Sequence, residues 1–275
     1  MSAIDGAYTR ASGRDAVPRV SLLRLEGLRK TFGGLVAIND LAFELEAGKI
    51  VAMIGPNGAG KSTVFNVITG IYAPTAGKIE LEGRSLAGLA TNRIASLGIA
   101  RTFQNIRLFA YMSAIDNVMT GRHARMHANM FASLLHLPGE RAEERRVRER
   151  ARELLAFVDL EGDASNYARN LPYGSQRRLE IARALASDPK LLLLDEPAAG
   201  MNPREKEGLV GLMGRIRASG VTVFLIEHDM NLVMNVSERI TVLDHGEKIA
   251  EGSPRAIRSD EKVIEAYLGR TDGAA

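Results

Sequence analysis

Apolar side chains alternate with polar ones in the first part of the chain. They recur at Leu23, Leu25 and Leu28, and again over residues 41–45. A period of two predicts half-buried strands, and residues 31–34 between the two runs predict a turn that carries one aromatic side chain. A shorter run at residues 78–81 predicts a further strand.

Continuous apolar runs at residues 50–54, 191–194 and 221–226 follow a different pattern. Runs of this length predict strands buried on both faces, as in a parallel sheet covered by helices. Farther along, residues 240–243 and 248–250 flank a polar turn and predict a hairpin.

A densely charged segment over residues 141–159 has one apolar stripe. The spacing i, i+4, i+7, i+8, i+11 predicts an amphipathic helix whose charged face is solvated, an interpretation that we prefer to nucleic-acid contact. Shorter helices are expected at residues 91–97, 115–119 and 262–268. The stripe consists of Val147, Ala151, Leu154, Leu155 and Val158.

Composition narrows the class of protein. The 275 residues are 45% apolar and 25% charged, which is ordinary for a globular protein, and no apolar run reaches the roughly 18 residues of a membrane span. The first 19 residues lack the apolar core of a secretory signal. A net charge of +3 does not favour nucleic-acid binding.

Metal sites outside the main motifs have little support. The chain has no cysteine, which excludes disulfides and thiolate ligands. His123 and His127 stand at i, i+4 and could share a helix face, with His136 nine residues on. Because no carboxylate partner stands in pattern with them, we favour a structural interpretation of these histidines over a metal site.

The first buried strand is followed by the segment Gly55-Pro56-Asn57-Gly58-Ala59-Gly60-Lys61-Ser62, which fits G-x-x-x-x-G-K-[ST], the phosphate-binding P-loop. Its glycines let the backbone curl so that N–H groups face phosphate oxygens, and the expected helix over 63–68 adds its positive end. Lys61 is expected to reach the β- and γ-phosphates, and the Ser62 hydroxyl to bind Mg²⁺. The flanking strand and helix argue against a chance glycine-rich turn.

Acidic residues end the second buried strand. Asp195 and Glu196 form a Walker B arrangement, in which Asp195 holds Mg²⁺ and Glu196 orients or polarises the attacking water. Taken alone, the pair could equally be a solvated acidic turn, but the upstream P-loop favours the nucleotide interpretation. His228 follows the third buried strand, at the sheet edge where open α/β folds bind ligands.

Just before the acidic strand, the segment Leu171-Pro172-Tyr173-Gly174-Ser175-Gln176-Arg177-Arg178-Leu179 continues into an Ala- and Arg-containing run that ends at Leu185. It resembles the signature loop and helix of ABC ATPases. Over residues 22–269 the chain is similar to the G-type ATPase subunit of bacterial branched-chain amino-acid importers. The motifs that carry the likeness are Phe32-Gly33-Gly34, Gly55 to Ser62, Arg101-Thr102-Phe103-Gln104, Leu171 to Leu185, Asp195 to Asn202, Glu227-His228-Asp229 and Ala266-Tyr267-Leu268-Gly269.

The resemblance implies ATP and Mg²⁺ as ligands and assigns roles to single residues. Phe32, in place of the more usual tyrosine, is expected to stack on adenine. Gln104 is the expected Q-loop residue, which senses Mg²⁺ and the γ-phosphate and touches the membrane partner, and His228 is expected to contact the γ-phosphate. The expected catalytic residues are Lys61, Glu196 and His228, the metal-binding residues Ser62, Gln104 and Asp195, and the nucleotide-binding residues Phe32, Gly55, Pro56, Asn57, Gly58, Ala59, Gly60, Lys61, Ser62, Thr63 and Gln104.

In such families two ATPase subunits dimerise head to tail, and each signature closes on the other subunit's P-loop. A helix that begins near Ser175 aims its dipole at that γ-phosphate. The usual signature is Leu-Ser-Gly-Gly-Gln, and here Pro172 removes both a hydroxyl and an N–H. Asn202 stands where aspartate is common. These departures lead us to expect an asymmetric heterodimer. The residues expected to face the other subunit's nucleotide are Tyr173, Gly174, Ser175 and Gln176.

The fold expected is α/β: a P-loop ABC ATPase with a mainly parallel sheet core, an antiparallel β edge or subdomain from the N-terminal strands, and a helical subdomain at about 112–172. One domain is expected over 21–270, with mobile tails at 1–20 and 271–275.

The expected function is the ATP-hydrolysing motor of an ABC importer, for branched-chain amino acids, peripheral on the cytoplasmic face of the inner membrane. Its partners are a second ATPase, two permeases and, indirectly, a substrate-binding protein, with no nucleic acid. A urea or amide importer and a lipopolysaccharide exporter are the nearest alternatives. A ribosome- or DNA-acting ABC protein and a P-loop kinase fit less well, because the chain has one P-loop, no cysteine hook and a signature-like segment.

Overall fold

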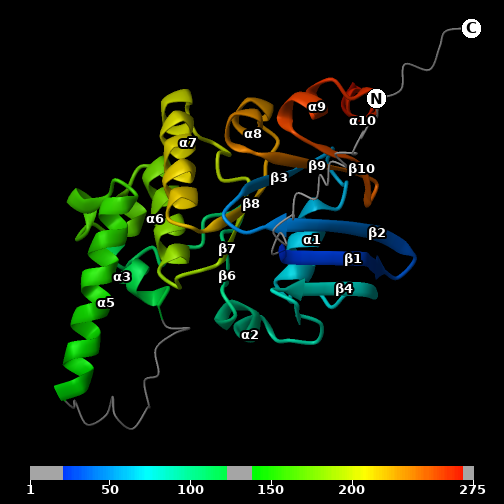
Figure 1. The fold of residues 1–275 in the computed structure, drawn as a ribbon. Helices are drawn as coiled ribbons and strands as arrows, with labels where there is room; N and C mark the ends of the chain where they lie inside the picture. The colour runs from blue at the N-terminus through cyan, green and yellow to red at the C-terminus, as the bar shows by residue number, and fades with distance from the viewer. Residues whose placement is uncertain (1–20, 123–137, 269–275) are drawn as a thin grey trace, which may run out of the picture.

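The computed structural model describes residues 21–122 and 138–268 (Figure 1). The expected tails at 1–20 and 271–275 and the histidines His123, His127 and His136 lie outside the described residues.

Six of the described strands form the central sheet, in the order β10-β9-β3-β8-β7-β6. All neighbours are parallel except β10, which pairs with β9 as the predicted hairpin. Alternate residues of the central strands enter two different cores, one on each face. This confirms that the continuous apolar runs are strands covered on both sides. The strands are β3 (Ile50–Ile54), β6 (Ile99–Arg101), β7 (Leu191–Asp195), β8 (Thr222–Ile226), β9 (Arg239–Asp244) and β10 (Glu247–Gly252).

The N-terminal strands form a second, antiparallel sheet in the order β2-β1-β4-β5. The expectation of an antiparallel edge on the main sheet was therefore wrong in this detail, although the antiparallel subdomain is confirmed. The reason is that these strands cover one face of the central sheet instead of extending its edge: Leu23 and Leu25 are buried in the core on that face, while Arg24 between them is exposed. The strands are β1 (Ser21–Phe32), β2 (Leu35–Glu46), β4 (Ala76–Leu81) and β5 (Arg84–Ser85).

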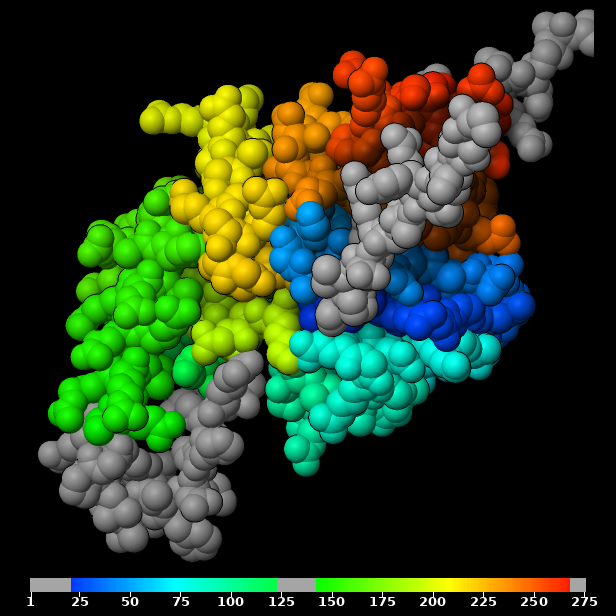
Figure 2. All heavy atoms as spheres, in the orientation of Figure 1, coloured from blue at the N-terminus to red at the C-terminus, as the bar shows by residue number. Residues whose placement is uncertain are grey.

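Helices cover the central sheet, and a helical arm stands beside it, visible as the green lobe in the space-filling view (Figure 2). All five residues of the predicted apolar stripe are buried in this arm. The described helices are α1 (Lys61–Ile68), α2 (Thr91–Ser96), α3 (Ala114–Thr120), α5 (Pro138–Phe157), α6 (Tyr173–Leu185), α7 (Pro203–Ala218), α8 (Met230–Val236), α9 (Pro254–Arg258) and α10 (Glu261–Leu268), with short 3-10 turns at Glu161–Asp163 and Ala168–Asn170.

The arm meets the core where α3 ends against α6. A Cβ added at Gly121 would lie 2.0 Å from the carbonyl oxygen of Arg183 and 3.0 Å from Ala186 Cβ. Gly121→Ala is therefore expected to lower the free energy of unfolding by about 1–3 kcal/mol, measured by urea denaturation. Gly162→Ala is the matched control, because a Cβ there meets nothing within 4 Å. Equal stability of the two variants would contradict this packing.

Candidate active site

The P-loop connects β3 to α1, as the sequence predicts. Gly55 has φ +151, and a Cβ there would lie 2.0 Å from the carbonyl oxygen of Leu243 in β9. Gly60 has φ +98, and its Cβ would lie 2.5 Å from the carbonyl oxygen of Ala37 in β2. Both positions require glycine, since L-residues rarely adopt these φ values and the neighbours are backbone atoms. The loop is thus held between the two sheets.

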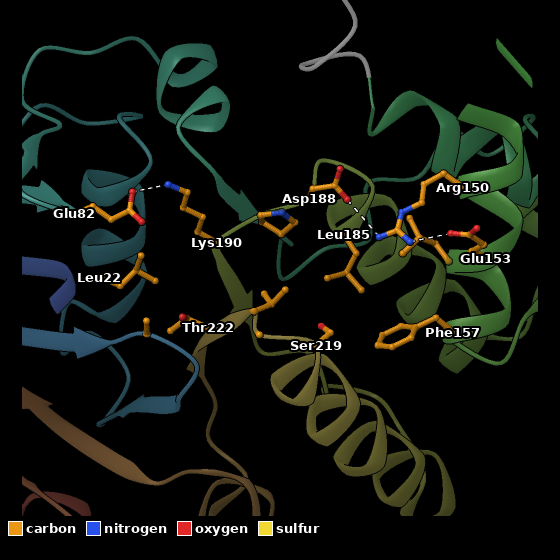
Figure 3. Close-up of a pocket in the computed structure, with 15 residues that line it drawn as sticks. Leu22, Glu82, Arg150, Glu153, Phe157, Leu185, Asp188, Lys190, Ser219 and Thr222 are labelled. Carbon is orange, nitrogen blue, oxygen red and sulfur yellow. Dashed lines mark hydrogen bonds and ion pairs between the residues drawn. The ribbon is translucent and has the colours of Figure 1, made fainter. Parts of the chain in front are cut away.

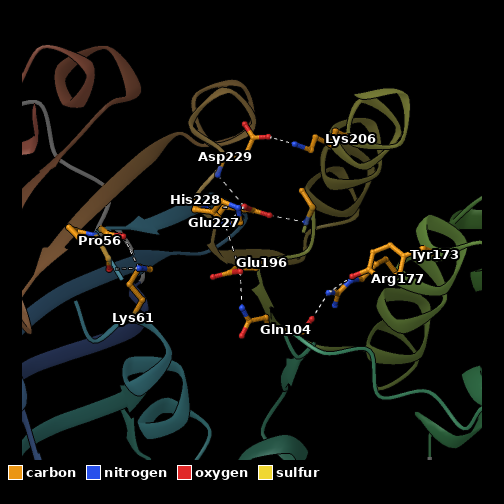
Figure 4. A network of polar contacts seen from close by, with 12 residues as sticks. Pro56, Lys61, Gln104, Tyr173, Arg177, Glu196, Lys206, Glu227, His228 and Asp229 are labelled. Atoms are coloured by element: carbon orange, nitrogen blue, oxygen red, sulfur yellow. Dashed lines mark hydrogen bonds and ion pairs between the residues drawn. The ribbon is translucent and has the colours of Figure 1, made fainter. Parts of the chain in front are cut away.

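Lys61 is buried at the first turn of α1. Its Nζ donates hydrogen bonds to the carbonyl oxygens of Gly55 (2.7 Å) and Pro56 (2.8 Å), so the ammonium closes the loop on itself (Figure 4). Burial lowers the pKa of Lys61, and the nearby carboxylates of Glu196 and Asp195 oppose that shift. The structure therefore brings the P-loop lysine close to the two acidic residues of β7. Ser62, Asn57 and Gly58 are exposed beside it.

Glu196 is held in an unusual backbone conformation. Its φ is +47, and its N–H donates to the carbonyl oxygen of Ile226 in the next strand (2.9 Å). A left-handed conformation at a residue other than glycine costs free energy and is typical of functional sites. The carboxylate accepts a hydrogen bond from Gln104 Nε2 at 2.9 Å, and His228 Nδ1 lies 3.6 Å from the same oxygen (Figure 4). Three predicted site residues from separate segments thus meet.

Glu227 is a buried residue of this site to which the sequence analysis gave no role. One oxygen accepts from the N–H of Ala198 (2.8 Å), and the other from the N–H groups of His228 (2.9 Å) and Asp229 (3.3 Å). Glu227 therefore ties the loop after β7 to the loop after β8 and fixes the position of His228. Asp229 in turn pairs with Lys206 of α7 at 2.6 Å. An acidic residue directly at the end of a buried strand was the available signal.

Phe32 lies at the tip of β1 and is 40% exposed. Its ring packs edge-on against Tyr72, with centroids 5.0 Å apart, and Lys30 Nζ lies 4.8 Å from its centroid. Tyr72 follows α1, and its N–H bonds to the carbonyl oxygen of Asn66 in that helix. An exposed aromatic face thus stands beside the helix that begins with the P-loop lysine.

The signature segment lies on the opposite side of Glu196 from Lys61 in Figure 4. Helix α6 begins at Tyr173, two residues before the expected start, with Pro172 at its N-cap. Gly174 and Ser175 are buried; a Cβ on Gly174 would lie 2.4 Å from the Glu205 carboxylate, and Ser175 Oγ accepts from Arg178. Tyr173, the aromatic residue among the four predicted signature residues, reaches solvent and is 42% exposed.

Helix α6 is also hydrogen-bonded to the Q-loop, the segment that carries Gln104. Arg177 is buried and donates to the carbonyl oxygens of Phe103 (2.8 Å) and Gln104, and to the Tyr173 hydroxyl (3.0 Å). Glu180 accepts from the Arg107 N–H at 3.3 Å. Burial raises the pKa of Glu180. The hydrogen bond from the Arg107 N–H and the charge of Arg177 oppose this rise. The signature helix and the Q-loop are thus one hydrogen-bonded unit, which no local pattern in the sequence indicates.

Asn202, which stands where the resembling family commonly has aspartate, is the N-cap of α7. Its side chain accepts from the Glu205 N–H (3.0 Å), and the Glu205 carboxylate accepts from the Asn202 N–H (2.9 Å), which forms a capping box. Since asparagine caps helices as well as aspartate does, this substitution keeps the local structure. Gln176 Nε2 donates to the carbonyl oxygen of Leu171 at 2.9 Å and so supports the start of α6.

A cavity of about 660 Å³ lies between the arm and the core but contains none of the predicted site residues (Figure 3). Its charged side chains pair with one another, Lys190 with Glu82 at 2.5 Å and Arg150 with Glu153 at 2.9 Å and Asp188 at 3.4 Å. We assign it no role in nucleotide binding.

The residues predicted for Mg²⁺ offer oxygen donors of three kinds: the Ser62 hydroxyl, the Gln104 amide and the Asp195 carboxylate. Such donors suit this hard cation. Among the described residues no cluster of three histidine, cysteine, aspartate or glutamate side chains could hold a metal by itself.

A P-loop lysine, a strand-end glutamate and a strand-end histidine that converge at the carboxyl edge of a parallel sheet are the arrangement of a P-loop ATPase. A family model described as ABC transporter matches residues 38–199, and one described as branched-chain amino acid ATP-binding cassette transporter matches residues 247–273. The chain belongs to the ABC transporter ATP-binding family. It is an ATPase cassette that binds adenine nucleotide.

Individual relatives support this assignment. The high-affinity branched-chain amino acid transport ATP-binding protein BraF of Pseudomonas aeruginosa is 47% identical over 249 residues, which cover 90% of this chain and 98% of BraF. The solved ADP conformation of an ATP-binding cassette of an ABC transporter is 32% identical, with a TM-score of 0.80 over 90% of this chain and 99% of that one. A dimeric bacterial ABC transporter cassette is 28% identical, with a TM-score of 0.72 over 85% and 99% of the two chains.

The α/β cassette predicted from the sequence is thus confirmed. Within the described residues, no helix is both long and apolar enough to cross a bilayer.

Proposed function

We propose that this chain is the ATP-hydrolysing subunit of an importer for branched-chain amino acids. The observation that carries the proposal is similarity to BraF along nearly the whole of both chains, together with the match of residues 247–273 to the branched-chain family model. A match to the general ABC transporter model alone is compatible with many transported substrates. The match of the C-terminal residues is to a model for branched-chain amino acid transporters only.

The site geometry supports a division of roles. Lys61 binds the β- and γ-phosphates, while free backbone N–H groups of the P-loop face them. Glu196 polarises the attacking water; Gln104 holds its carboxylate through the 2.9 Å hydrogen bond, and His228 Nδ1 lies nearby at 3.6 Å. Phe32 offers its exposed face to adenine.

Mg²⁺ fits the donors Ser62, Gln104 and Asp195, as argued above. When bound, it neutralises charge on the β- and γ-phosphates. Asp195 is buried at the end of β7, so its carboxylate is oriented by the protein rather than by solvent.

A groove beside the Q-loop is the proposed docking site for a permease. The groove has a volume of about 780 Å³ and is lined largely by apolar side chains, among them Ile71, Ile94 and Phe103. Phe109 also lines it and is 53% exposed. Arg107, in the same segment, is bonded to Glu180 of α6, so a partner seated here contacts the unit that carries Gln104. An apolar segment of a membrane subunit matches this lining.

Phe109→Ser is expected to lower the amount of permease that co-purifies with the chain by at least about tenfold, because an exposed aromatic anchor is lost. Nucleotide affinity should not change, since Phe109 lies outside the P-loop and the other predicted nucleotide-binding residues. Ile264→Ser is the matched control, because Ile264 is an exposed apolar residue of α10. Normal permease recovery with Phe109→Ser would place the docking surface elsewhere.

The signature geometry favours an asymmetric heterodimer. Gly174 and Ser175 are buried within the chain, and Pro172 supplies neither a hydroxyl nor an N–H at the helix start. The other subunit is then expected to provide the stronger signature for this subunit's P-loop. A symmetric, fully active homodimer of this chain with two ATP molecules would contradict this.

The test is to purify the chain with its membrane partners in mild detergent and identify them by mass spectrometry. Two permeases and a second, different ATPase support the proposal. Exporter-type membrane subunits with this ATPase alone would favour the lipopolysaccharide alternative, and permeases of a urea or amide system would change the substrate. Recovery of ribosomal proteins, or of no membrane partner, would refute the transport function.

A further inference from the structure

Arg101 is a buried cation in direct contact with the Walker B aspartate. Its Nη2 lies 2.8 Å from Asp195 Oδ2, and the two side chains are only 7% and 6% exposed. The residues are 94 positions apart in the chain and meet because β6 and β7 are parallel neighbours. Such a pair is little screened by water or salt.

The guanidinium is fixed from three further sides. Nη1 donates to Asn66 Oδ1 in α1 at 2.7 Å and approaches Oγ1 of Thr69, the C-cap residue of that helix, at 3.4 Å. The group also contacts two aromatic rings, 5.4 Å from the centroid of Phe65 and 5.0 Å from that of Phe103. Arg101 therefore cannot swing away from Asp195 without breaking contacts with the helix that follows the P-loop.

The charges around Asp195 decide what a cation experiences there. Arg101 already balances the Asp195 carboxylate, and the Lys61 ammonium adds a second positive charge, which interacts with Glu196 and with Asp195. A divalent cation that approaches Asp195 alone is repelled by both groups, since charges a few ångströms apart interact strongly in a partly buried site. A triphosphate brings the negative charge that offsets this repulsion.

We propose that Arg101 is a positioning residue that holds Asp195 and keeps it from binding a divalent cation until nucleotide is present. The cation then enters with ATP rather than before it. This inference rests on the proposed function, because it takes Asp195 as the metal-binding carboxylate.

The experiment titrates nucleotide-free protein with Mn²⁺ and follows the free ion by electron paramagnetic resonance. Arg101→Gln is expected to bind Mn²⁺ at least tenfold more tightly than the unaltered chain, and Asp195→Asn in the same protein should abolish the gain. Arg101→Lys keeps the charge and should behave as the unaltered chain does. Arg93→Gln is the control for loss of an arginine, because Arg93 is exposed on α2.

Removing Arg101 leaves a buried carboxylate unpaired, so a second variant guards against unfolding. Asn66→Asp keeps the bond to Arg101 but draws its charge away from Asp195, and it should also tighten Mn²⁺ binding. The inference is overturned if both Arg101→Gln and Asn66→Asp bind Mn²⁺ as weakly as the unaltered chain, or if the gain survives Asp195→Asn.

A different result would show that Asp195 does not have the proposed metal-binding role. If Asp195→Asn alone leaves Mg²⁺-dependent ATP binding unchanged, Asp195 is not the metal-binding carboxylate. If that variant loses Mg²⁺ dependence while Arg101→Gln changes nothing, the metal role stands and only the role of Arg101 is lost.

Discussion

Glu196→Gln is expected to reduce steady-state ATP hydrolysis by about 10²–10⁴-fold while leaving ATP binding unchanged. The amide has the shape of the carboxylate and keeps an oxygen that can accept the 2.9 Å hydrogen bond from Gln104. It is a far weaker base, so it cannot polarise the attacking water. Phosphate release measures the first quantity, and equilibrium binding of a fluorescent ATP analogue measures the second.

Glu207→Gln is the matched control, because Glu207 is exposed on α7, away from the P-loop. Its turnover should equal that of the unaltered chain. If Glu196→Gln hydrolysed ATP at an undiminished rate, another group would have to activate the water. If it lost ATP binding instead, Glu196 would serve the structure of the site rather than its chemistry.

Lys61→Met is expected to weaken ATP binding by about 10- to 150-fold, which corresponds to the loss of a hydrogen bond to a charged group. Methionine keeps most of the buried apolar stem but removes the ammonium. The variant also loses the bonds to the carbonyl oxygens of Gly55 and Pro56, so the loop itself becomes less ordered. Both effects act in the same direction, and isothermal titration calorimetry with ATP measures their sum.

The control for Lys61→Met is Lys78→Met, since the Lys78 side chain is 70% exposed on β4. Unchanged ATP affinity in Lys61→Met would mean that the triphosphate does not lie in this P-loop. Loss of affinity in both variants would point to a general effect of net charge.

Local patterns were sufficient for most of the fold. The apolar runs at residues 50–54, 191–194 and 221–226 became central strands because such runs are stable only when both faces are covered. The stripe from Val147 to Val158 became the buried face of α5 and the turn after it, because spacing alone defines a helix face. The strand–loop–helix context of Lys61 likewise follows from sequence neighbours.

Helix α7 shows a local signal that was overlooked. Its buried side chains Leu209, Leu212, Met213 and Ile216 follow helical spacing, and Asn202 with Glu205 forms a capping box at its start. The place of β1 and β2 in a separate sheet, by contrast, depends on which surface covers them, and alternation does not specify that.

Contacts between distant segments explain the rest of the site. Gln104 and Glu196 are 92 positions apart, and Arg177 reaches the Gln104 carbonyl across 73. Only the resemblance indicated that Gln104 belongs to the site, and no motif pointed to the hydrogen bonds of Arg177. Glu227 stood in a recognised motif, but the motif did not indicate which N–H groups it binds. Such residues act through tertiary hydrogen bonds, so their roles appear only when the strands are placed side by side.

The most direct test of the account is ATP-driven uptake of radiolabelled leucine into proteoliposomes that contain the purified complex of this chain with its permeases and second ATPase, supplied with the substrate-binding protein. Uptake is expected to require ATP on the side of this chain and to be lost with Glu196→Gln. Uptake at an unchanged rate with Glu196→Gln, or ATP hydrolysis by a correctly assembled complex that never moves leucine, isoleucine or valine, would contradict it.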